Sequence, residues 1–236
     1  MKILAISAHD KYIKTGKKFN IPAFGSAKRA FGAEKLLCRL GFCNNDAKTV
    51  AKDIFKSYNK PERGYHGITH IVNMTESFDK FILESRQSFM VKNADEFRFA
   101  ILMHDYINGE PDDVKKSADK AGGFLRKISQ NYDTSYVENL ILATDYSKTQ
   151  NLSFDQQLMQ DIDIEILGKS ATEYKQYSDA IKQQYADYPD KIYNPARIKV
   201  LKAFIAKDKI YNTPYYQGKY EQQARENIKH EINTLS

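Results

Sequence analysis

Apolar residues recur at intervals of three and four along most of this chain, and this spacing is the feature that most limits how it can fold. In residues 67–84 the apolar face includes Ile68, Ile71 and Phe78, and residues 93–106 repeat the pattern. One face of an α-helix repeats at this interval. Only 11 glycines and 6 prolines interrupt the 236 residues, so helices can run long between them. The sequence predicts an all-α fold.

Turn and capping residues divide the chain into about ten expected helices. They cover, approximately, residues 26–40, 45–58, 67–84, 93–106, 114–129, 135–146, 153–167, 171–188, 194–211 and 216–235. No alternating run longer than residues 2–7 indicates a strand, and no repeat or Ser/Gly/Pro-rich linker divides the chain. We therefore expect a single helical bundle over residues 26–236, preceded by an irregular N-terminal extension, residues 1–25.

Composition excludes several classes of protein. The chain is long enough to bury a core without disulfides or a structural metal, which excludes a disulfide-stabilised miniature scaffold. Its two cysteines, Cys38 and Cys43, have neither zinc-site nor redox-motif spacing, and they favour a reducing compartment. No stretch has the length of a signal peptide or of a membrane span. We expect a cytoplasmic protein without a membrane partner, and its oligomeric state stays open.

The net charge favours an anionic partner but does not distinguish a small substrate from a nucleic acid. The chain carries 36 Lys and Arg against 30 Asp and Glu, a net charge of +6. These basic residues are spread along the whole sequence and are not gathered in an arm or stripe. A small anionic substrate accounts for the charge as well as a nucleic acid does, and nucleic acid is the weaker interpretation.

A few histidine and acidic residues are the candidates for catalysis and metal binding. His66 and His70 are four residues apart, so at the start of a helix both project from one face. His104 is followed directly by Asp105, and a helix can direct both into a cleft between helices. Residues 159–167 set acidic side chains among apolar ones, and a buried acid needs a partner, of which a cation is one. This arrangement suits a metal-bound substrate.

The order of these residues resembles the HD superfamily of metal-dependent phosphohydrolases, which is named for its adjacent His-Asp pair. Residues 63–70 (RGYHGITH) are similar to the YHN…H stretch of cyclic-nucleotide phosphodiesterases. Residues 99–106 (FAILMHDY) look like the helix of the central pair, and residues 161–164 (DIDI) look like the later D-x-D-L ligand stretch. The likeness to bacterial HD-superfamily phosphohydrolases runs from about residue 33 to 235. It implies an HD-domain-like helical bundle.

The resemblance also implies roles for individual residues. It makes a divalent metal ion the cofactor (Mn, Fe, Zn, Co or Mg), with a single ion as the first expectation. The implied metal ligands are His70, His104, Asp105 and Asp163. Among the implied catalytic residues, His66 donates a proton to the leaving group and Asp105 acts at the metal. The candidates for holding the substrate phosphate are Arg63 and Lys148. The implied substrate is a small phosphorylated molecule, a nucleotide by first choice.

Alternatives remain at several of these positions. Asp161 is either a residue that orients a ligand or a surface acid, and Arg63 has a rival role in anchoring its loop. Where the bacterial group has a glutamate this chain has Val114, and the asparagine of YHN is Gly67. Both departures favour a second hypothesis, a non-catalytic regulatory module that binds metal and nucleotide. His9 starts a second His-Asp pair without supporting ligands.

Overall fold

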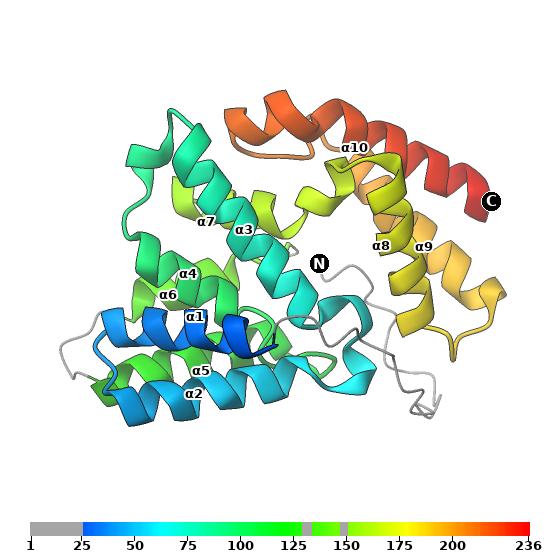
Figure 1. Cartoon of the computed structure of the whole chain (residues 1–236). Coiled ribbons are helices and arrows are strands. Elements are labelled where there is room, and N and C mark those ends of the chain that lie inside the picture. Colours follow the sequence, from blue (N-terminus) through cyan, green and yellow to red (C-terminus); the bar gives the residue numbers. More distant parts are fainter. Residues whose placement is uncertain (1–25, 129–133, 147–150) are drawn as a thin grey trace.

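The computed structural model describes residues 26–128, 134–146 and 151–236, and the regular secondary structure in these ranges is all helical (Figure 1). The α-helices are α1 (Ser26–Arg39), α2 (Asn44–Tyr58), α3 (Ile68–Glu84), α4 (Ala94–Met103), α5 (Asp113–Ile128), α6 (Ser135–Leu142), α7 (Phe154–Asp163), α8 (Ala171–Gln184), α9 (Asp190–Ile205) and α10 (Pro214–Leu235). Short 3-10 helices are η1 (Pro61–His66), η2 (Ser88–Met90) and η3 (Glu165–Gly168). The described residues contain no strand. The all-α prediction is confirmed, while the expected extension, residues 1–25, lies outside the described ranges.

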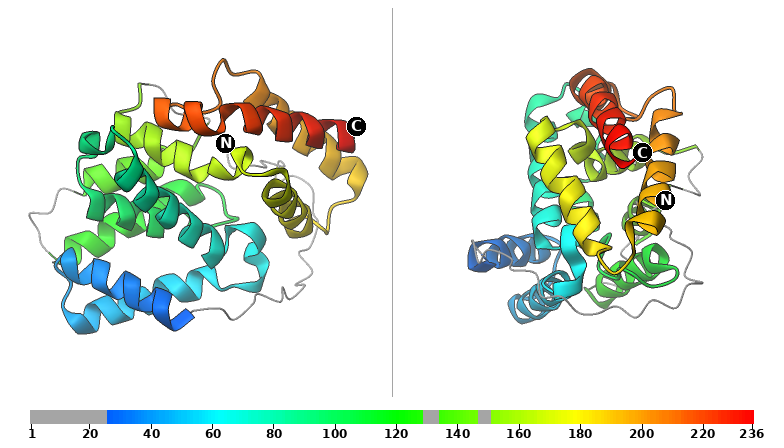
Figure 2. Two further views of the ribbon diagram at one scale, coloured as in Figure 1. Left: turned by 45° about the horizontal axis from the view of Figure 1, so that its top comes forward. Right: turned by 90° about the vertical axis from the view of Figure 1, so that its right-hand side faces the viewer.

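The helices form two groups with α3 and α7 between them (Figures 1 and 2). In the first group α1 packs on α2 and α4, and α6 packs on α4 and α5. In the second group α10 packs along α9 and η3, and α8 packs on η1 and η3. Helix α3 contacts α4, α7 and η1, so it joins the two groups. The junction between them is where the candidate site lies.

One hydrophobic core runs through both groups, and specific contacts reinforce it. In the first, the rings of Phe78 and Phe97 are stacked with their centroids 4.3 Å apart. In the second, the fully buried Arg197 donates hydrogen bonds of 2.8 and 3.0 Å to the two carboxylate oxygens of Glu231. Such a bidentate pair satisfies both charges without water. The stacked rings join α3 to α4, next to His70 and His104, and the ion pair joins α9 to α10.

Among the helices that end earlier than the sequence pattern predicts, two have their ends at the site. The expected helix 93–106 stops at Met103, because the Asp105 N–H donates a 3.2 Å hydrogen bond to the Tyr58 hydroxyl instead of to the carbonyl of Ile101, which lies 2.9 Å from His104 Nδ1. The expected helix 153–167 divides into α7 and η3. Side chains at these two helix ends therefore leave the regular helix surface and face the junction.

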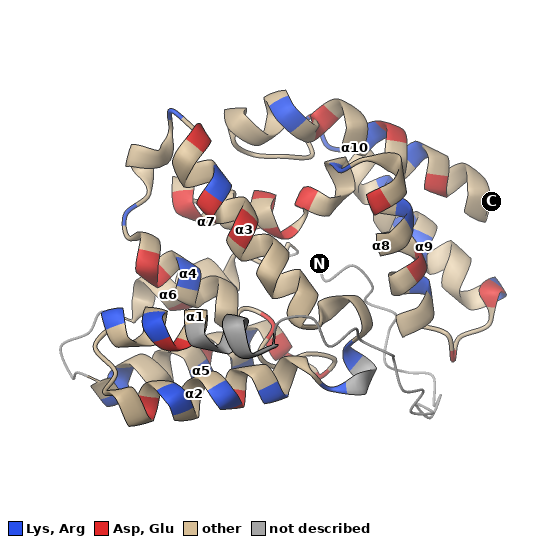
Figure 3. Ribbon diagram, in the orientation of Figure 1, with Lys and Arg blue, Asp and Glu red and all other residues tan. Residues whose placement is uncertain are grey.

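The surface carries mixed charge. Lys and Arg lie on helices throughout the molecule, interspersed with acidic residues (Figure 3). Several form ion pairs one helical turn apart, such as Lys115 with Asp119 and Lys175 with Asp179, each at 2.7 Å. In the described ranges, none of the helices combines the length and the apolar character needed to cross a bilayer.

Candidate metal centre

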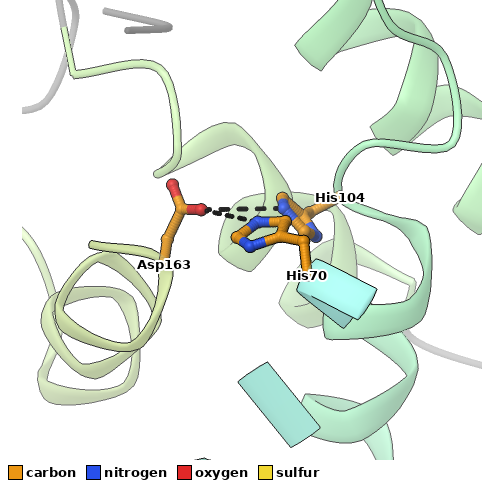
Figure 4. Close-up of side chains that lie close together, drawn as sticks. All are labelled: His70, His104 and Asp163. Atoms are coloured by element: carbon orange, nitrogen blue, oxygen red, sulfur yellow. Dashed lines mark ion pairs between the residues drawn. The ribbon is translucent and has the colours of Figure 1, made fainter. Parts of the chain in front are cut away.

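Three side chains from three helices converge at the junction (Figure 4). His70 lies in the first turn of α3, His104 follows the last residue of α4, and Asp163 is the last residue of α7. Asp163 Oδ1 is 3.2 Å from His70 Nε2 and 3.8 Å from His104 Nε2. One ligand atom of each lies within 4.8 Å of the others. We call these residues the His-Asp cluster, and as a group they can hold a metal ion.

The two imidazole rings present nitrogens that lack a hydrogen-bond partner. In the described part of the chain, Nε2 of His70 and Nε2 of His104 are buried and make no aligned hydrogen bond. Native proteins seldom leave buried polar atoms in this state unless an ion or a water satisfies them. His104 Nδ1 lies 2.9 Å from the carbonyl oxygen of Ile101, and a carbonyl only accepts. The Nδ1 proton is therefore directed at the backbone and the Nε2 lone pair at the cluster, as in histidines that bind metals.

Asp163 is held in its ionised form. The Tyr146 hydroxyl donates a 3.1 Å hydrogen bond to Asp163 Oδ2, which leaves Oδ1 for the two histidines. Burial acts to raise the pKa of the Asp163 carboxyl, but the neighbouring His70 and His104 rings outweigh it and the pKa lies below its ordinary value. An ionised carboxylate is the form in which an aspartate binds a metal ion.

Asp105 lies beside the His-Asp cluster. It is 4% exposed, and its Oδ2 is 3.5 Å from His104 Nε2. The adjacent pair thus points into the same junction, as the sequence predicts. Asp105 is not one of the three residues whose ligand atoms all lie within 4.8 Å of one another. Its roles as fourth ligand and as catalytic residue stay predictions.

Arg63 anchors the backbone that carries Asp105. Its side chain is 3% exposed. The guanidinium donates hydrogen bonds to the carbonyls of Asp105 and Tyr106 and to the Ser57 hydroxyl, and it lies 4.8 Å from the centre of the Tyr58 ring. These contacts correspond to the anchoring alternative for Arg63, with backbone carbonyls as its partners.

His66 lies next to the cluster and contacts a distant helix. The rings of His66 and His70 are 5.9 Å apart and perpendicular. His66 Nδ1 is 3.1 Å from the amide oxygen of Gln184, the last residue of α8. Gly64 makes this approach possible. It has a φ of +51°, and a Cβ there would lie 2.9 Å from the Gln184 Cβ.

Tyr65 packs among the histidines. Its ring centroid lies 4.9 Å from that of His70, 5.3 Å from that of His66 and 4.7 Å from that of Tyr177. Burial, with the nearby Tyr177 and Asp163, raises the pKa of the Tyr65 hydroxyl well above 10. The phenol thus stays protonated at ordinary pH and can donate a hydrogen bond. It forms an aromatic wall on one side of the cluster.

Asp161 has a structural role. It is fully buried, so the surface-acid alternative is wrong. Its carboxylate accepts hydrogen bonds of 2.7 to 3.0 Å from Asn212 and Thr213, at the start of α10. Burial raises the pKa of Asp161 to about 6, although these four hydrogen bonds act to lower it. By fixing the end of α7, Asp161 positions Asp163.

Some residues of the site carried no recognisable signal in the sequence. Tyr146, in the segment after α6, contacts Asp163, and Gln184, at the end of α8, contacts His66. No motif marks either of them. Lys148, the second candidate for phosphate contact, lies outside the described residues.

Comparisons with protein-family models, curated proteins and solved structures gave no match to this chain. The family resemblance of the sequence therefore depends on its motif residues, and membership of the HD superfamily stays a prediction.

Proposed function

We propose that this chain is a metal-dependent phosphohydrolase that cleaves a phosphoester or phosphoanhydride bond of a small substrate, a nucleotide by first choice. The observation that carries the proposal is the convergence of His70, His104 and Asp163 with two buried nitrogens that lack partners. The sequence resemblance supports the reaction class. The free thiols of Cys38 and Cys43 fit a reducing compartment, and we assign the activity to the cytoplasm.

The donor set favours a transition metal. Two imidazole nitrogens and one carboxylate oxygen suit Mn²⁺, Fe²⁺, Zn²⁺ or Co²⁺ better than Mg²⁺, which prefers an all-oxygen environment. A bound ion would supply Lewis acidity, since it lowers the pKa of water and offsets charge that develops at phosphorus. The cluster accounts for one ion.

The remaining residues have roles around this centre. His66, which is not in the cluster, donates the proton that the leaving oxygen needs, because an imidazole titrates near working pH. Asp105 completes the ligand set or orients the attacking water. With Arg63 directed at backbone carbonyls, Lys148 is the candidate for the substrate phosphate.

A non-catalytic module that binds metal and nucleotide is the second candidate. Val114 is 8% exposed and packs in the apolar core, so this position supplies no carboxylate to the junction. The same three ligands would then hold an ion with structural or sensory consequences only.

Turnover by metal-stripped protein tests the proposal. We would add Mn²⁺, Co²⁺, Zn²⁺ or Mg²⁺ and measure phosphate and nucleoside release from nucleoside mono-, di- and triphosphates, cyclic nucleotides and bis-p-nitrophenyl phosphate. We expect metal-dependent turnover by the wild type that is lost in Asp105→Asn and Asp163→Asn. Asp155→Asn is the matched control, because Asp155 is a buried acid at the other end of α7. Metal binding without turnover on any substrate would move the assignment to the regulatory module.

A further inference from the structure

The contact between His66 and Gln184 joins two segments that are 118 residues apart in sequence. His66 ends η1, and Gln184 ends α8. Helix α8 packs directly on η1 (Figure 1). The sequence motif that includes His66 ends at residue 70, so it does not indicate which group fixes the orientation of this ring.

The contact is built into the backbone. Gly64 adopts φ +51° and ψ −120° inside η1, a conformation that residues with a side chain rarely adopt. The space where its Cβ would be is filled by the Gln184 side chain, whose Cβ, Oε1 and Cγ are 2.9, 3.1 and 3.2 Å from that position. The glycine therefore lets Gln184 lie flat against η1 and reach the ring of His66.

The chemistry of the contact fixes the proton on the ring. Oε1 of an amide only accepts hydrogen bonds, so the ring nitrogen facing it must carry the proton. Nδ1–H of His66 then donates to Gln184 over 3.1 Å, and Nε2 is the nitrogen that can exchange a proton with a substrate. A histidine's tautomer and orientation are set in this way by the partner of its other nitrogen.

We propose that Gln184 is the positioning residue for His66: by accepting a hydrogen bond from Nδ1–H it holds the ring orientation from which the imidazolium donates its Nε2 proton to the leaving oxygen, and the ring is left as the neutral Nδ1–H tautomer. This inference rests on the proposed phosphohydrolase function. Gln184 touches neither the cluster nor, in this role, the reacting atoms. It acts on the rate of the chemical step through His66 and not on metal affinity.

Gln184→Met tests the role, because methionine keeps the length of the side chain and its packing on Gly64 but lacks the acceptor. Gln184→Glu is the rescue variant, since a carboxylate oxygen accepts the same hydrogen bond. For the Mn²⁺-loaded protein we expect Gln184→Met to lower kcat about 10- to 100-fold, the range for residues that orient catalytic groups. KM and Mn²⁺ affinity should stay within about twofold, and Gln184→Glu should restore most of kcat.

A spectroscopic measurement separates this inference from the proposed function. In ¹⁵N-labelled metal-free protein, long-range ¹H–¹⁵N spectra report the tautomer of each histidine, and His66→Asn assigns the signal. We expect the Nδ1–H tautomer in the wild type and its loss in Gln184→Met. Unchanged tautomer and kcat in Gln184→Met would overturn the proposal, as would a changed tautomer with unchanged kcat. Absence of wild-type turnover would refute the phosphohydrolase, while the tautomer spectra would still decide whether Gln184 orients His66.

Discussion

Replacing Asp163 by asparagine should remove most of the stabilisation that a metal ion gives to this protein. Asp163 supplies the one carboxylate of the His-Asp cluster. Asparagine keeps its shape, and its amide oxygen can still accept the hydrogen bond from Tyr146. The variant then turns an amide N–H₂ toward His70 and His104 in place of a charged oxygen. The fold should persist while metal affinity falls at least 100-fold.

The size of the effect follows from mass action. At a metal concentration of 100 times Kd, binding stabilises the folded state by about 2.7 kcal/mol. For a chain of this length each kcal/mol raises Tm by about 2–4 °C, so the wild type should gain roughly 5–11 °C. If Kd rises about 100-fold, the same metal concentration equals Kd, and the gain falls to about 0.4 kcal/mol, or roughly 1–2 °C.

Scanning calorimetry of chelator-stripped protein with and without Mn²⁺ or Co²⁺ measures these shifts. Asp155→Asn is the control, because Asp155 Oδ2 accepts the hydrogen bonds from Lys92 and Tyr136 while Oδ1 accepts none in the described ranges. Asparagine can keep the accepting oxygen in place there. The control should keep the full metal shift. An equal shift in Asp163→Asn and wild type would refute the assignment of the cluster as the metal centre.

Three further outcomes follow from contacts elsewhere. Gly64→Ala places a Cβ on a backbone with φ +51° against Gln184, and urea unfolding should show a loss of about 1–3 kcal/mol; an unchanged midpoint would contradict this. Arg63→Met leaves two carbonyls without their donor and should cost about 2–4 kcal/mol by the same measurement. Arg197→Met leaves the Glu231 carboxylate buried without its cation and should cost about 3–5 kcal/mol. A second substitution, Glu231→Leu, should recover part of that loss.

The helices were predictable because their signal is local. The apolar spacing that predicts residues 67–84 as a helix is the spacing of the buried face of α3. The ends of α4 and α7 were not predictable to the residue. They depend on the hydrogen bond from the Asp105 N–H to the Tyr58 hydroxyl at one helix end, and on those from Asn212 and Thr213 to Asp161 in the other. Such partners are distant in sequence, and the spacing of apolar residues does not predict them.

For the candidate site, too, the sequence predicted some residues and not others. Spacing and motif order selected His70, His104 and Asp163, and the structure brings all three together. The motif did not reveal that Tyr146 and Gln184 would support the site, because both lie outside the motif stretches. A sequence motif contains the candidate ligands and catalytic residues. The side chains that orient them depend on how the helices pack, which the motif does not show.

The distances along the chain between the three ligands determine when a metal ion can enter. His104 follows His70 by 104 − 70 = 34 residues, and Asp163 follows His104 by 163 − 104 = 59 residues. In a zinc finger the ligands are close neighbours and the ion can organise a short chain. Here the ligands meet only after α3, α4 and α7 have docked, because closing loops of this length must come first. We therefore expect metal uptake to follow folding, and a loaded centre would mark a correctly assembled chain.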